Sequence, residues 1–200
     1  MEKLDLYLTR LRDELALSAF DTGKSKYLDL AATENITSPA ELASLAQPPD
    51  QLSGFQEIIM GEVANCHLDK AKIGINELLK HLLVIINPDL EEFLAERYMY
   101  RLRMIFRRCL MPDFPFQEEI WNYICDCLRS TGSFLIGGGY FPAAREIIDS
   151  LAGMGRIAAL KGLPTANTQA SLRTLENKAL QKNEKQLALT AKNARFNLET

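Results

Sequence analysis

Apolar residues recur every three or four positions along most of the chain, which is the spacing of an amphipathic helix. The first such segment covers residues 2–20, where four leucines share one face. The same spacing runs from residue 55 to residue 87, from 89 to 112, from 118 to 136 and from 142 to about 162. No segment alternates apolar and polar residues for more than a few positions, as a half-buried strand would. We therefore predict an all-α fold of antiparallel helical hairpins in a bundle or short solenoid.

Proline-containing segments divide this pattern into parts. Gln47-Pro48-Pro49-Asp50 is the clearest linker, and Pro164 interrupts the chain a second time. We expect an N-terminal helical segment at residues 1–47, a helical core of stacked hairpins at 53–163, and an appended, polar and basic C-terminal helix at 164–200 that is partly frayed. The apolar stripes of this last helix are too narrow to bury much area, so we expect it to serve assembly more than core stability.

Two helical hairpins resemble each other at a constant offset along the chain. Leu68-Asp69-Lys70-Ala71-Lys72 matches Phe141-Pro142-Ala143-Ala144-Arg145, and apolar residues follow at the same spacing in both. The second unit resembles the second half of a tetratricopeptide hairpin, because small and aromatic residues stand where that family places them, namely Gly132, Gly139, Phe141 and Ala144. The first unit departs from the family, with Ile59 and Cys66 in place of glycines. The resemblance implies a scaffold that binds a peptide or protein on a concave surface, and generic packing of two amphipathic hairpins is the alternative.

Composition and charge add one asymmetry. The apolar fraction of 47% and the charged fraction of 24% are those of a globular protein. Residues 1–150 carry 15 basic and 23 acidic side chains, whereas residues 151–200 carry 8 basic and 3 acidic ones. The basic residues are spread along the tail, which favours a tail resting against the acidic body over one that meets an anionic partner.

The most distinctive local feature is a run of arginines on one predicted helix: Arg97, Arg101, Arg103, Arg107 and Arg108. They border an apolar face that contains Tyr98, Leu102 and Phe106. Interleaved basic and aromatic residues can bind nucleic acid. Arginines beside a buried stripe can equally extend over the core and pair with carboxylates, and the acidic net charge favours this second interpretation.

Catalytic and metal-binding patterns are weak. Cys66 and His67 are adjacent, so on a helix they point about 100° apart and suit a nucleophile–base pair poorly. His81 follows Glu77 by four residues, which is the spacing of a helix-surface pair. Glycines 137–139 follow a helical segment and fit a tight interhelical turn better than a phosphate-binding loop. We expect no cofactor and no metal.

The cysteines and the absence of a targeting pattern indicate the compartment. Cys66, Cys109, Cys125 and Cys127 form no C-x-x-C pair, the N-terminus has no apolar signal region, and no run approaches the length of a membrane span. We expect a cytoplasmic protein with free thiols and no membrane span.

Together these observations favour a non-enzymatic helical scaffold or adaptor that binds a protein or peptide, with possible homo-oligomerisation through the C-terminal helix. The alternative is a nucleic-acid-associated protein that uses the arginine helix and the basic tail. An enzyme without a recognisable motif comes third.

Overall fold

The computed structural model describes residues 49–198, and every regular element in that range is a helix. The predicted all-α class is therefore confirmed for the described residues. Contacts divide the chain into two units, residues 1–58 and 59–200, and the architecture below is that of the second. The predicted helix at residues 2–20 and the segment 1–47 lie outside the described residues.

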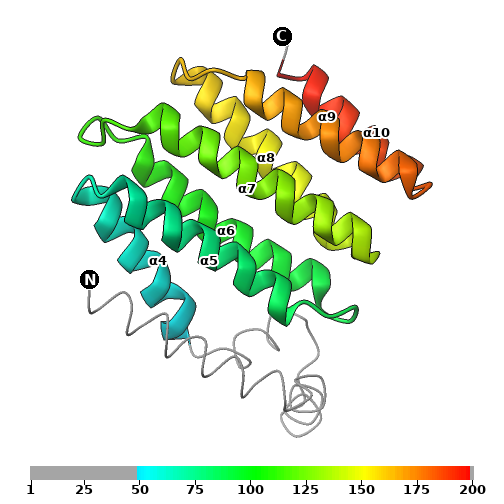
Figure 1. The fold of residues 1–200 in the computed structure, drawn as a ribbon, viewed down its shortest axis with the longest axis horizontal. Helices are drawn as coiled ribbons and strands as arrows, with labels where there is room; N and C mark the ends of the chain where they lie inside the picture. Colours follow the sequence, from blue (N-terminus) through cyan, green and yellow to red (C-terminus); the bar gives the residue numbers. More distant parts are fainter. Residues whose placement is uncertain (1–48, 199–200) are drawn as a thin grey trace, which may run out of the picture. The chain divides into compact units, whose positions relative to one another are not determined.

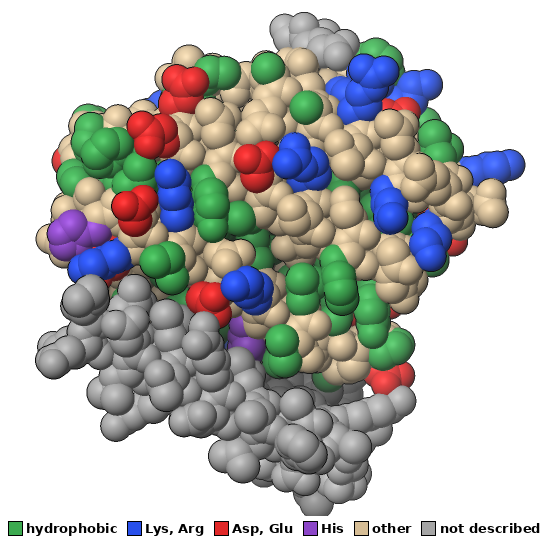
Figure 2. Space-filling view, in the orientation of Figure 1, with side chains coloured by type: hydrophobic (Ala, Val, Ile, Leu, Met, Phe, Trp, Pro, Cys, Tyr) green, Lys and Arg blue, Asp and Glu red, His purple; other side chains and the backbone are tan. Residues whose placement is uncertain are grey.

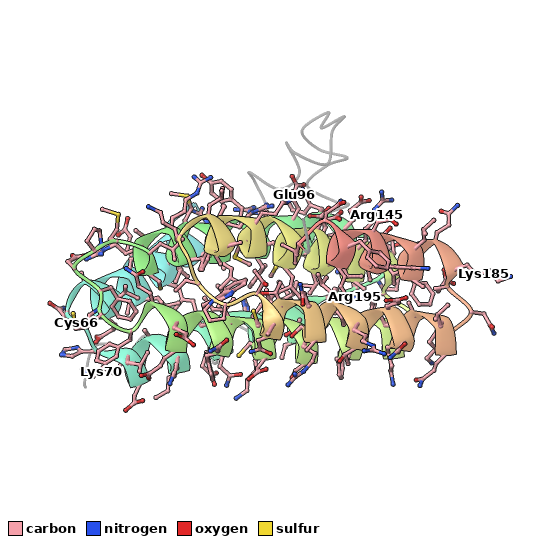
Figure 3. The ribbon with its side chains drawn as sticks, turned by 90° about the horizontal axis from the view of Figure 1, so that it is seen from above. Cys66, Lys70, Glu96, Arg145, Lys185 and Arg195 are labelled. Atoms are coloured by element: carbon pink, nitrogen blue, oxygen red, sulfur yellow. The ribbon has the colours of Figure 1, made fainter. Side chains whose placement is uncertain are left out.

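Seven helices follow one another in the described part of the chain: α4 (Pro49–Ala64), α5 (Leu68–Ile85), α6 (Glu91–Cys109), α7 (Gln117–Gly138), α8 (Phe141–Leu160), α9 (Ala166–Gln181) and α10 (Lys185–Phe196). From α5 onward they form two layers (Figures 1 and 3). Helices α5, α7 and α9 lie side by side in one layer, and α6, α8 and α10 lie side by side in the other. Each antiparallel hairpin, α5–α6, α7–α8 and α9–α10, thus stacks on the one before it.

The ends of α6 follow from its sequence. The side-chain oxygen of Asn87 accepts hydrogen bonds from the backbone amides of Asp89 and Leu90, which fixes the turn that leads into the helix. Acidic residues occupy the first turn, and Arg107 and Arg108 occupy the last, so both ends oppose the helix dipole. The helix ends before Pro112, as predicted.

Four interhelical turns share one backbone conformation. Cys66, Gly139, Gly162 and Asn183 each have a positive φ, between 57° and 86°. The amide that follows each of them donates to a carbonyl five residues earlier, which is the Schellman arrangement that closes a helix C-terminus. The predicted interhelical turn is therefore confirmed at Gly139, whereas Gly137 and Gly138 are the last residues of α7.

This shared turn accounts for the similarity between the two hairpin sequences. Leu68 and Phe141 are the first residues of α5 and α8, and each follows a left-handed turn. However, α5 and α8 lie in different layers of the stack. The helices of one layer, α5, α7 and α9, begin at Leu68, Gln117 and Ala166. This even spacing is longer than the tetratricopeptide repeat of about 34 residues. The sequence similarity therefore reflects similar turns before α5 and α8. It does not correspond to the repeat length of the stacked hairpins.

The C-terminal segment differs from the single helix that we expected. It forms two helices, α9 and α10, because the chain reverses at Asn183. The reversal places both narrow apolar stripes on the same hairpin, so that Leu172 and Leu175 of α9 and Leu187 of α10 are all buried. Close packing holds α9 to the helices before it: a Cβ at Gly132 of α7 would lie 2.9 Å from the Leu175 side chain. The hairpin is thus packed into the stack.

None of the helices in the described part of the chain combines the length and the apolar composition that crossing a membrane requires.

Candidate functional site

Two of the arginines of α6 lie near aromatic rings of the same helix. The guanidinium of Arg97 lies 5.8 Å from the ring centroid of Phe93, and that of Arg101 lies 5.7 Å from the ring of Tyr100. The apolar face predicted for this helix, which contains Tyr98, Leu102 and Phe106, is fully buried. These contacts fit arginines that lie along the rim of a packed helix.

Arg108 closes a loop. Its two terminal nitrogens donate to the two carboxylate oxygens of Asp113 at 2.8 and 2.7 Å, and this bidentate pair joins the end of α6 to the loop before α7. The hydrogen bonds from Arg108 lower the pKa of Asp113. Arg108 therefore has a structural partner within its own chain.

Arg103 lies near the carboxylate of Glu146 on the neighbouring helix α8. The pKa of Glu146 on α8 is raised by burial first, then by the nearby Asp149 and Glu96, while Arg103 lowers it. Figure 3 shows Glu96 of α6 and Arg145 of α8 projecting from the same outer side of their layer. This side of the stack carries both signs of charge, which is unfavourable for a nucleic-acid backbone. Among the five arginines only Arg107 is exposed, and the other four are half-buried.

Cys66 and His67, which we considered as a nucleophile–base pair, each contact a different group. The His67 ring nitrogen Nδ1 lies 2.7 Å from Glu62, whereas the Cys66 thiol donates to the backbone carbonyl of Asp113 at 3.4 Å. Burial raises the pKa of Cys109 and of Cys125 to about 12, so both remain protonated thiols and poor nucleophiles. Among the described residues, no group of three potential metal ligands converges.

His81 corrects one interpretation of the sequence. The predicted surface pair with Glu77 is wrong, because His81 is only 8% exposed and its Nδ1 is hydrogen-bonded to the hydroxyl of Tyr98 on α6. Glu77 pairs with Lys80 at 3.1 Å instead. Burial lowers the pKa of His81 to about 4, so the ring is neutral at pH 7. The pair is part of the packing between α5 and α6.

The feature that the sequence analysis did not single out lies on the exposed side of α5 and α7. The α5 side chains opposite its buried stripe are Ile73, Glu77, Lys80 and Val84, spaced by four, three and four residues along one line of the helix. Ile73 is 51% exposed and Val84 is 60% exposed. The signal that could have found this side is the pair of outward apolar residues, Ile73 and Val84, on a helix whose other side is already buried.

The neighbouring helix α7 presents a matching line of side chains: Tyr123, Cys127, Ser130 and Phe134. Tyr123 lies beside α5, because the ammonium of Lys72 is 5.8 Å from its ring centroid. Its pKa is raised to about 12, first by burial and then by Cys127, with Glu77 adding to the effect. Phe134, two turns beyond Cys127 on this line, is 57% exposed.

We call these two lines together the α5–α7 face. Figure 2 views this layer of the stack and shows hydrophobic side chains gathered over the carboxy-terminal part of α5 and beside it. Ile73, Val84 and Phe134 are large apolar side chains exposed on two neighbouring helices, and such exposure is uncommon on a surface with no partner. The face combines aromatic and aliphatic groups with the charged pair of Glu77 and Lys80, which lies between Ile73 and Val84 on α5.

Comparison of the chain with protein-family models, with curated proteins and with solved structures finds no match.

Proposed function

We propose that this chain is a helical scaffold that binds a protein partner through the α5–α7 face. The observation that carries the proposal is the exposure of Ile73, Val84 and Phe134 on two adjacent helices of one layer. Burial of these side chains against a partner would remove apolar area from water, and aromatic anchors such as Phe134 and Tyr123 commonly dominate such contacts.

The charges of the α5–α7 face help to decide between a protein and a nucleic acid as the partner. Lys72 is engaged with Tyr123 and Lys80 with Glu77, so the face carries no dense cluster of unpaired cations among its described residues. A nucleic acid requires such a cluster to neutralise its phosphates. An amphipathic protein segment, helical or extended, requires only the apolar line with polar groups beside it. We therefore favour a protein segment.

Site-specific photo-crosslinking tests the proposal. A photoreactive phenylalanine analogue is placed at Phe134 of the full chain in cells, and in a second protein at Tyr100. Tyr100 is a matched control, because it is also aromatic and is 52% exposed, but it lies on α6 in the other layer. We expect discrete crosslinked protein adducts from position 134 and not from position 100, unchanged by nuclease. Equal adducts from both positions, or adducts to nucleic acid alone, would refute the proposal.

A further inference from the structure

One side of the α9–α10 hairpin is not covered by any described helix. Helix α9 packs against α7 and α8, and α10 packs against α8 and α9, which continues the stacking of the earlier hairpins. No described helix follows α10, so the side of α9–α10 that faces away from α7 and α8 is the next position in the stack (Figure 1). We call this side the terminal edge.

Helix α10 is apolar on two sides. Its inner side buries Leu187, Ala188 and Ala191. Its other side carries Lys185, Leu189, Lys192 and Phe196, spaced by four, three and four residues and thus in one line. Leu189 is 56% exposed and Phe196 is 45% exposed. A helix that already packs through one stripe and exposes a second one can bind another helix.

The charge of the terminal edge selects among possible occupants. The hairpin that forms this edge, residues 166–198, carries two acidic side chains, Glu176 and Glu184, and six basic ones: Arg173, Lys178, Lys182, Lys185, Lys192 and Arg195. Figure 2 shows lysine and arginine side chains gathered over this end of the stack. Two copies of so basic an edge would repel each other, whereas an acidic partner would be attracted.

The surroundings of Phe196 argue against a nucleic acid as the occupant. The guanidinium of Arg195 lies 4.7 Å from the centroid of the Phe196 ring, and the ammonium of Lys192 lies 5.9 Å from it. Cations already contact this ring, so it is poorly available for stacking on a base. Leu189, two turns nearer the start of the line, has an aliphatic side chain that cannot bind phosphate.

We propose that the terminal edge binds an acidic amphipathic helix of a partner protein. Leucine or similar side chains of that helix would cover Leu189 and Phe196, and its carboxylates would pair with Lys185 and Lys192. The proposal concerns a surface separate from the α5–α7 face, so either can fail without the other.

Fluorescence anisotropy with the full chain tests this proposal. The probe is a labelled synthetic helix with leucines on one side and glutamates on the other. The comparison probes are the same helix with lysine in place of glutamate, a single-stranded RNA, and vesicles that contain phosphatidylserine. We expect saturable binding of the glutamate helix that weakens as salt rises, and weaker binding of the other three.

Substitutions locate the binding. Lys185→Glu with Lys192→Glu, and separately Leu189→Gln with Phe196→Ala, should each raise the dissociation constant about tenfold. All four side chains are on the exposed side, so circular dichroism should confirm an unchanged fold. Arg107→Glu with Arg145→Glu is the control, because it changes the net charge equally at exposed positions on α6 and α8 and should leave binding within about twofold.

Three results would overturn the proposal: no saturable binding of the glutamate helix, equal weakening by the control pair, or stronger binding of RNA or vesicles that the same substitutions abolish.

Discussion

Individual glycines show how closely the layers approach. A Cβ at Gly155 of α8 would lie 2.7 Å from the Thr168 side chain of α9, whereas a Cβ at Gly153, two residues earlier in the same helix, would meet nothing within 4 Å. The two positions share a helix and differ in packing, which makes them a matched pair.

We predict opposite effects of alanine at these positions. Gly153→Ala should stabilise the protein by about 0.5–1 kcal/mol through helix propensity. Gly155→Ala should destabilise it by about 1–2 kcal/mol, because the buried Thr168 must move. Urea unfolding of both variants measures the difference. If both alanines stabilise the protein equally, α8 and α9 do not approach each other as described.

The buried imidazole of His81 makes a second prediction at the scale of the residue. Its pKa falls from 6.5 to about 4 on folding, so between these values the unfolded chain binds a proton that the folded chain does not. The stabilising effect of the neutral ring is therefore complete above pH 6.5 and is lost as the pH falls towards 4. Between pH 7 and pH 5 this group alone should lower the free energy of unfolding by about 2 kcal/mol.

Urea unfolding at both pH values, with His81→Gln beside the wild type, isolates this contribution from that of the carboxylates. His81→Gln should reduce the difference between the free energies of unfolding at pH 7 and at pH 5. This holds whether or not the substitution also changes the free energy of unfolding at pH 7. An equal fall in both proteins would mean that His81 is accessible to protons in the folded state.

At the scale of the element, much of the helical order follows from local signals. Hydrophobic spacing located α5 to α8, and Gly139 marked a real boundary, whereas α6 begins at Glu91, two residues after the start of the predicted segment. These signals work because they act through the backbone of a few adjacent residues. The structure divides the long apolar segment from residue 55 to residue 87 by a turn at Cys66.

Other boundaries could not be predicted in this way. The interpretation of residues 47–50 as a linker is wrong at Pro49 and Asp50, because these two residues form the start of helix α4. Asn183 carries a left-handed turn without a glycine, so the break between α9 and α10 left little trace in the sequence. The burial of His81 depends on tertiary packing with Tyr98 of another helix, which no local pattern contains. The burial of residues of this kind is determined by tertiary packing and not by their neighbours in sequence.

At the scale of the whole molecule, the face that we propose as the site differs from the arginines that stand out in the sequence. The arginines of α6 attract attention because they are frequent, yet Arg108 has a partner in Asp113 and Arg103 lies near Glu146. The α5–α7 face is inconspicuous in the sequence because its side chains come from two helices that the whole of α6 separates along the chain. A binding surface that two helices share becomes visible only when their packing is known.

The central claim of this account is that the α5–α7 face binds a protein. Quantitative capture by the full-length chain after nuclease treatment tests it most directly, comparing Val84→Gln with Phe134→Gln against the control pair Tyr100→Gln with Leu160→Gln. All four side chains are at least half exposed, and the control pair lies in the other layer. The account predicts that the first pair reduces the captured partner about tenfold or more while the control retains it. Equal retention by both pairs would contradict the account.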